Sequence, residues 1–264
     1  MSGNLLKIGL SLPCKDCTEL QNFEYIPDCF EFAELSGETV ADALHLHKEH
    51  NLWSEFEFFD FRDLIPPALA SQITPENHMI LQDFKKQLRK LFASASLCKA
   101  QNIGIDPGWE NLCSDAGCRE LFNDILRSTA GDREFYDLQM LMTVRLPGSG
   151  ALPVTESLNL LHRLNNYRVN LALDIYPHEL INSNIEWEKL LAHFRFDVKI
   201  IRFCYPSELG NKLLYQHIAP VVDAVRKWQQ EVYIYFAPSG KADLDELAET
   251  AQQINPKEYD HESQ

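Results

Sequence analysis

Short apolar segments rich in β-branched and aromatic residues recur along the chain, each followed by a polar or proline-marked turn and a helix-like stretch. The eight segments are Lys7–Leu12, Cys29–Leu35, Phe56–Phe61, Asn102–Ile105, Met140–Leu146, Val169–Ile175, Val198–Cys204 and Val232–Ala237. Between most of them, apolar residues recur at three and four positions, as at Val40, Ala43 and Leu44. This alternation predicts parallel strands joined by helices, because parallel neighbours need a crossover of a dozen or more residues.

The number of segments indicates the fold class. Eight βα units within 264 residues favour a closed, single-domain (β/α)8 TIM barrel, whose usual size is about 250 residues. A doubly wound open sheet is the alternative. Since no Gly/Ser-rich or Pro-rich linker divides the chain, we expect one domain over residues 1–254. Residues 255–264 are polar and aperiodic, and predict a flexible C-terminal tail.

The charge and composition of the chain limit the kinds of partner that it can bind. The formal net charge of -15 argues against nucleic acid, because binding to a phosphate backbone needs a basic surface. No apolar run approaches the ~18 residues of a membrane span, and Met1–Lys7 lacks the features of a signal peptide. The seven cysteines fit a reducing compartment, although Cys14 and Cys17 have a spacing that leaves a redox role open. We therefore expect a cytoplasmic protein without a membrane partner, and homo-oligomerisation is left open.

Three arginines end predicted strands of this acidic chain: Arg62, Arg145 and Arg202. In a TIM barrel the chemistry lies at the C-terminal ends of the strands. Because guanidinium groups bind carboxylates and phosphates bidentately, the arginines predict a small-molecule ligand that is anionic or strongly polar. Alternatively, each arginine pairs with a strand-end carboxylate such as Asp60, Asp106 or Asp174 and closes the barrel mouth.

Two loops at the same end of the barrel carry further candidate ligand-binding residues. Glu208 and Lys212 lie in a polar turn after the seventh segment. Ser239 follows the eighth segment and precedes a helix-like run, a position where barrels often bind phosphate. In the alternative interpretation these residues only form turns and helix caps.

Acid–base chemistry is predicted around the sixth segment. Asp174 ends this segment and His178 lies just beyond it, so a carboxylate and an imidazole are close in sequence. Both groups transfer protons, and both bind divalent metals. Glu34 and Asp60, at the ends of the second and third segments, are further candidate catalytic carboxylates. The pattern does not fix whether Glu34 points inward, because barrel strands are covered on both sides.

Three motifs carry a resemblance to a known family: Phe32-Ala-Glu-Leu-Ser36, the helix through Ala93-Ser-Ala-Ser96 into Asn102-Ile-Gly-Ile-Asp-Pro-Gly108, and Leu173-Asp-Ile-Tyr-Pro-His178. With these motifs and the order of its elements, the chain resembles the xylose isomerase-like TIM barrels, the superfamily of sugar isomerases and epimerases, over Lys7 to Pro238. The resemblance implies a divalent metal. Its ligands would be a Glu ending the fifth strand, an Asp or Glu with a nearby His on the sixth, a His on the sixth or seventh, and a Glu ending the eighth.

The chain departs from that ligand set at several positions. The fifth segment ends in Arg145, the seventh offers Arg202 instead of a histidine, and the eighth carries no carboxylate. Asp174 and His178 match in kind, but three residues separate them where the family usually has two. Replacing carboxylates by arginines disfavours a dication and favours an anion. We therefore expect a degenerate metal site, and the cofactor stays unknown.

Two functional hypotheses follow. In the first, the chain is a sugar isomerase- or epimerase-like enzyme that acts without the family's metal on a polar, anionic, carbohydrate-like metabolite. Asp174 and His178 would transfer the proton and Glu34 or Asp60 would assist, while the three strand-end arginines fix the anion. In the alternative, the chain is a non-catalytic barrel of that family that binds a metabolite or a protein.

Overall fold

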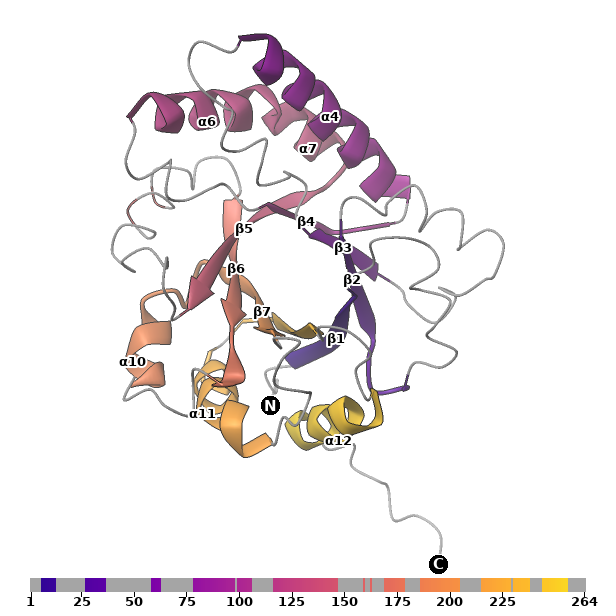
Figure 1. The fold of residues 1–264 in the computed structure, drawn as a ribbon, viewed down its shortest axis with the longest axis vertical. Helices are drawn as coiled ribbons and strands as arrows, with labels where there is room; N and C mark the ends of the chain where they lie inside the picture. The colour runs from indigo at the N-terminus through magenta and orange to yellow at the C-terminus, as the bar shows by residue number, and fades with distance from the viewer. Residues whose placement is uncertain are drawn as a thin grey trace, which may run out of the picture.

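A closed eight-stranded barrel forms the centre of the molecule (Figure 1). The computed structural model describes residues 6–12, 27–36, 58–62, 78–97, 99–105, 116–146, 159, 162, 169–178, 186–204, 215–228, 230–237 and 244–255. The strands are β1 (Leu6–Leu12), β2 (Phe32–Ser36), β3 (Phe58–Arg62), β4 (Asn102–Ile105), β5 (Gln139–Leu146), β6 (Val169–Ile175), β7 (Val198–Cys204) and β8 (Val232–Ala237). Each strand pairs in parallel with the next, and β8 pairs with β1. The predicted (β/α)8 barrel is confirmed.

The strand bounds agree with the sequence pattern over most of the barrel. β4, β6, β7 and β8 begin and end at the predicted residues. β2 begins at Phe32 instead of Cys29, because the chain first makes a turn in which the amide of Phe30 donates to the carbonyl of Pro27 at 3.1 Å. Phe30 is nonetheless buried, and its burial explains why an apolar pattern extends beyond the strand.

Helices cover the outside of the barrel (Figure 1). They are α4 (His78–Leu97), α6 (Ala116–Ser128), α7 (Ala130–Phe135), α10 (Trp187–Ala192), α11 (Tyr215–Arg226) and α12 (Leu244–Ile254). α4, α6 and α7 gather on the side of β4 and β5, whereas α10 to α12 follow the later strands (Figure 1). None of the helices in the part of the chain that the structure describes could cross a membrane.

The end of α12 is tied to the barrel through Asn255. Its backbone amide donates to Ala251 O at 3.2 Å, and its side-chain Nδ2 donates to Leu6 O in β1. Asn255, the first residue of the predicted flexible tail of residues 255–264, therefore has a defined position. Residues 256–264 lie outside the described residues, so their flexibility stays a prediction.

An aromatic and aliphatic cluster fills the interior of the barrel. It consists of Phe32, Leu141, Ala172, Ile200, Tyr233 and Tyr235. A Cβ on Gly9 would lie 2.5 Å from Tyr235 Cε1 and 2.7 Å from Phe32 O, so only glycine lets the Tyr235 ring fit beside β1. With these side chains packed inside, the polar residues of the interior lie toward the C-terminal ends of the strands.

Candidate active site

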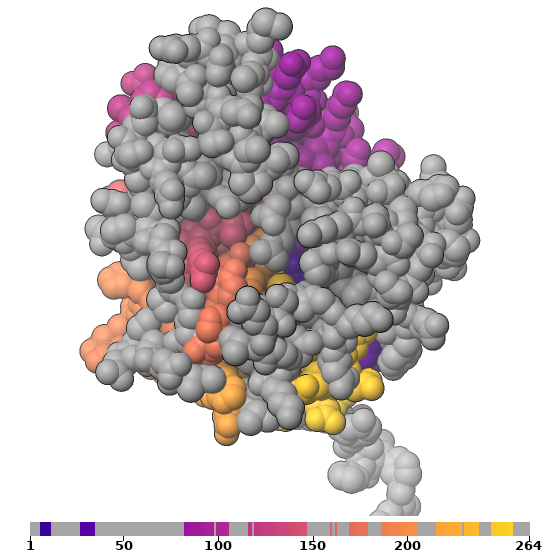
Figure 2. Space-filling model, in the orientation of Figure 1, coloured from indigo at the N-terminus to yellow at the C-terminus, as the bar shows by residue number. Residues whose placement is uncertain are grey.

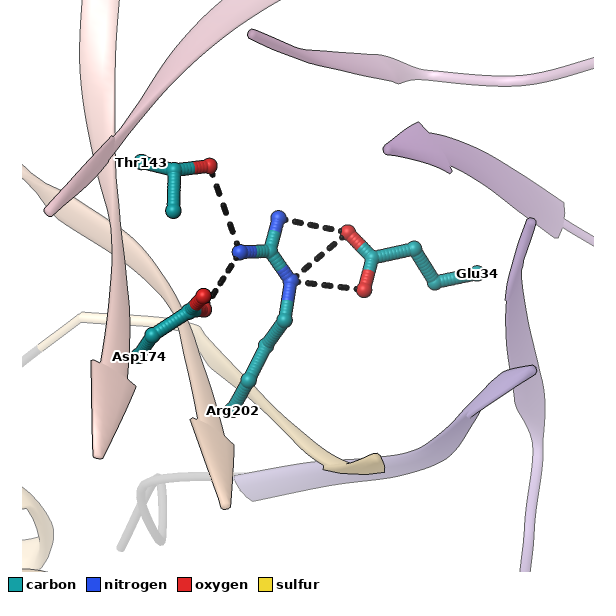
Figure 3. Close-up of polar contacts among 4 residues, drawn as sticks. All are labelled: Glu34, Thr143, Asp174 and Arg202. Atoms are coloured by element: carbon teal, nitrogen blue, oxygen red, sulfur yellow. Dashed lines mark hydrogen bonds and ion pairs between the residues drawn. The ribbon is translucent and has the colours of Figure 1, made fainter. Parts of the chain in front are cut away.

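Arg202 reaches across the barrel from β7 to Glu34 on β2 (Figure 3). Its Nε donates to Glu34 Oε1 and Oε2 at 2.9 and 2.6 Å, and its Nη2 donates to Oε1 at 2.7 Å. The two planar groups thus form a bidentate ion pair, the strong geometry for these groups. The side chains are only 0% and 1% exposed. Glu34 therefore points into the barrel, which the sequence pattern did not decide.

Two further residues bind the opposite side of the same guanidinium. Arg202 Nη1 donates to Asp174 Oδ1 at 2.6 Å and to Thr143 Oγ1 at 3.3 Å. Asp174 lies on the neighbouring β6, where its Cα is in register with Arg202, and Thr143 lies on β5. Figure 3 shows the guanidinium between Glu34 on one side and Asp174 and Thr143 on the other. These four residues are called the central cluster below.

The central cluster fixes the charge of Arg202. Burial by itself lowers the pKa of Arg202, but the charges of Glu34 and Asp174 and their hydrogen bonds outweigh it, and the pKa lies well above its ordinary value. Arg202 is therefore a permanent cation in the barrel interior. The ion pair of Arg202 with Asp174 agrees with the alternative interpretation of the sequence, in which a strand-end arginine pairs with a strand-end carboxylate instead of a ligand.

Asp174 is the carboxylate of the central cluster that solvent reaches. Its side chain is 7% exposed, against 1% for Glu34. It also lies next to the last residue of β6, at the end of the barrel where enzymes of this architecture place their chemistry. A ligand entering from that end would meet Asp174 before it met Glu34 or Arg202.

Arg145 on β5 and the rings of Tyr176 and His178 after β6 lie near Asp174 along the chain or across the sheet. Arg145 is exposed, its Cα is in register with Asp174, and its Cζ lies 4.2 Å from the centroid of the Tyr176 ring. The rings of Tyr176 and the half-buried His178 meet edge to face, with centroids 5.9 Å apart. In the space-filling view, rose and orange atoms of the segments around β5 and β6 reach the surface near the centre of this face (Figure 2). The end of β5 and the segment after β6 therefore bring Arg145, Tyr176 and His178 together at one end of the barrel.

The other predicted site residues are placed only in part. The structure gives the backbone of Asp60 and Arg62, with the Cα of Asp60 in register with Glu34 and that of Arg62 with Ser36. Glu208, Lys212 and Ser239 lie outside the described residues.

Thr143 and Tyr176 were not predicted as site residues from the sequence. Thr143 lies two residues before Arg145 on β5, so both side chains point to the same face of the strand. This alternation could have indicated Thr143 as a site residue. For Tyr176, its position between Asp174 and His178 was the only signal.

The described residues do not fit the divalent metal site that the resemblance implies. At the relevant positions β5 carries Arg145, whose Cα is in register with Asp174, β7 carries Arg202, and β8 carries Tyr235. Within the described residues, no group of three or more His, Cys, Asp and Glu side chains could hold a metal ion. A guanidinium nitrogen 2.6 Å from Asp174 Oδ1 would also repel a dication at that carboxylate.

Comparisons with known proteins identify the fold. The amino-acid sequence matches no protein-family model and no curated protein. Among solved structures, D-psicose 3-epimerase with D-fructose has a TM-score of 0.66 and 11% identity over 94% of this chain and 96% of that one. The 3-keto-D-glucoside 4-epimerase YcjR from E. coli has a TM-score of 0.63 and 10% identity over 93% and 99%. A family 2 AP endonuclease from Brucella melitensis has a TM-score of 0.62 and 14% identity over 94% and 98%. The chain has the fold of the xylose isomerase-like TIM barrels.

Proposed function

We propose that the chain is a sugar isomerase- or epimerase-like enzyme that moves a proton next to the carbonyl of a polar, carbohydrate-like metabolite. The observation that carries the proposal is the position of Asp174, held by Arg202 at the C-terminal end of β6. Two of the structures with this fold are sugar epimerases. An endonuclease also has the fold, but the net charge of -15 disfavours a nucleic-acid substrate for this chain.

Asp174 and His178 are the proposed proton-transfer groups. A carboxylate fixed by a neighbouring guanidinium keeps one position as the substrate enters, and positioning of the base is a main source of its efficiency. His178, four residues later and beside Tyr176, supplies an imidazole as the second proton-transfer group. An epimerase needs two such groups when the proton leaves one face of a carbon and returns to the other.

Glu34 and Arg202 are proposed as positioning residues. Both are buried, so they act on the substrate through Asp174 and do not touch it. Asp60, whose Cα is in register with Glu34, stays the proposed additional carboxylate. The anion-binding role then falls to Arg145, which is exposed beside Tyr176, and to Arg62, Lys212 and Ser239, while Glu208 is proposed to bind polar groups of the substrate.

We further propose that the reaction needs no divalent metal. The two described carboxylates of the central cluster, Glu34 and Asp174, already bind a permanent cation, Arg202. The negative charge that develops on the substrate oxygen during proton transfer would be stabilised by a guanidinium at the mouth, for which Arg145 is the candidate.

The test is proton exchange with solvent. EDTA-treated protein is incubated in D2O with ketoses, aldoses, sugar phosphates and sugar acids, and NMR follows deuterium entering the carbon next to the carbonyl. We expect exchange with at least one compound, a loss of about 10²-fold or more in Asp174→Asn, and no gain from Mn²⁺, Mg²⁺ or Co²⁺. Asp223→Asn, in an exposed ion pair on α11, is the matched control and keeps the activity.

The possible outcomes separate the hypotheses. Exchange that is unchanged in Asp174→Asn contradicts the assignment of the proton-transfer residue. Exchange that appears only with added metal contradicts the metal-free reaction. If no compound exchanges but one of them stabilises the fold, the chain is the non-catalytic, metabolite-binding barrel.

A further inference from the structure

Arg133 is a buried cation outside the barrel. It belongs to α7, and its carbonyl accepts from the amide of Leu138 just before β5 begins, at the opposite end of that strand from Arg145. Arg133 is 3% exposed. Its Nη2 donates to Leu126 O, near the end of α6, at 3.1 Å. Its Nε and Nη1 are buried and have no hydrogen-bond partner.

Neighbouring cations of the same helical layer are paired with carboxylates. Lys85 Nζ lies 2.8 Å from Asp124 Oδ2, which joins α4 to α6. Arg89 Nε lies 2.9 Å from Asp132 Oδ2, which joins α4 to α7. Arg133 makes no such ion pair with any residue that the structure describes. Lys85 and Arg89, which are more accessible, are thus paired, whereas the more deeply buried Arg133 has no anion among the described residues.

The surroundings of Arg133 disfavour its charge. Burial lowers the pKa of Arg133 to about 10. The carbonyl end of α6 offers some compensation, but Leu126 O also accepts from Thr129 Oγ1 at 3.5 Å. Native proteins pair nearly all buried polar groups, and an uncompensated buried charge is strongly destabilising. Two unmet donors on one buried guanidinium therefore point to an acceptor that carries negative charge.

We propose that Arg133 anchors an anion site between α6 and α7 that takes a small oxyanion, either inorganic phosphate or a carboxylate. Nε and Nη1 lie on different edges of the guanidinium, so one oxyanion would accept from one of them and neutralise the charge that burial disfavours. The anion enters by local opening of α7. This helix has six residues, of which Arg133 is the buried one, and it ends in Phe135, which is 81% exposed. The site is independent of the proposed reaction.

The experiment measures thermal unfolding of the full chain in sodium phosphate, sodium acetate and sodium chloride at equal ionic strength. We expect phosphate or acetate to raise the Tm of the wild type by roughly 3 °C for each tenfold increase above the dissociation constant. Arg133→Met should lose this rise. Arg89→Met is the matched control, because it removes a neighbouring exposed arginine, and it should keep the rise. The salt that acts identifies the oxyanion.

A second readout separates anion binding from simple capping of α6. In chloride, Arg133→Met should unfold at the wild-type temperature or above it, because it removes a buried charge and two unmet donors. A lower Tm of this variant in chloride, together with no rise of the wild type in phosphate or acetate, would assign Arg133 to capping alone and overturn the proposal. An equal rise in wild type and Arg133→Met would also overturn it. If Arg133→Met does not fold, calorimetric titration of the wild type with phosphate and acetate decides, and absence of binding refutes the site.

Discussion

Replacing Glu34 by Gln tests whether the ion pair with Arg202 stabilises the barrel. The substitution keeps the size of the side chain but removes its charge, so Arg202 Nε and Nη2 lose their carboxylate at a site that is 0% exposed. Removing one partner of a buried ion pair costs about 3–5 kcal/mol. Because the amide oxygen still accepts one hydrogen bond, we expect the lower end, roughly 3 kcal/mol. Domains have about 5–15 kcal/mol of total stability, so the variant should fold.

The assay is urea unfolding at pH 7, followed by circular dichroism and tryptophan fluorescence. In thermal unfolding, the same loss of roughly 3 kcal/mol in the free energy of unfolding would lower the Tm by about 6–12 °C. The matched control is Glu186→Gln, which removes an exposed carboxylate paired with Lys189 and should change stability by less than about 1 kcal/mol. Equal losses in the two variants would refute the reasoning, since a fully buried pair would then be worth no more than a surface pair.

Three further predictions concern other parts of the molecule. Burial raises the pKa of the Asp197 carboxyl, and the nearby His162 opposes part of this rise. The stability that Asp197 contributes is therefore fully present below its ordinary pKa and is lost as the pH rises through the raised pKa. Asp197→Asn should therefore be more stable than wild type in urea at pH 7, with a difference that shrinks toward pH 4; a constant difference contradicts this. Gly9→Ala should cost about 1–3 kcal/mol in urea unfolding, because its Cβ meets the Tyr235 ring at 2.5 Å and Phe32 O at 2.7 Å. Tyr235→Ala should remove the part of that cost that is due to the ring; additive losses argue against the contact. If the proposed reaction holds, Arg145→Met should raise KM at least tenfold for an anionic sugar and leave a neutral one unaffected, whereas equal changes for both would exclude anion binding by Arg145.

The strands that hold most of the central cluster were predictable from the sequence for a physical reason. β6 and β7 are covered on both faces, so each reads as an apolar run, and the inward Asp174 and Arg202 interrupt these runs near their ends. Parity placed Arg202 on one face of its strand but did not tell which face was inward. The turn before β2 was missed because Cys29 and Phe30 are apolar for packing reasons, not because they are in a strand.

The contacts within the central cluster could not be predicted in the same way. Glu34 and Arg202 are separated by 168 positions in the sequence, and no local pattern relates them. Strand-end charges were visible, but whether an arginine there binds a carboxylate of the barrel or a ligand depends on the distance across the closed sheet. That distance follows from the closure of all eight strands and from the filling of the interior below, which Gly9 and Tyr235 make possible.

The bond between Glu34 and Arg202 also has a consequence for how the chain folds. During synthesis, β2 leaves the ribosome long before β7, so Glu34 has no counter-ion until most of the barrel exists. A half-barrel that buried Glu34 early would carry an uncompensated charge, which disfavours a compact N-terminal intermediate. The late arrival of Arg202 therefore favours burial of Glu34 only when the barrel closes, so that this ion pair couples the stability of the two halves.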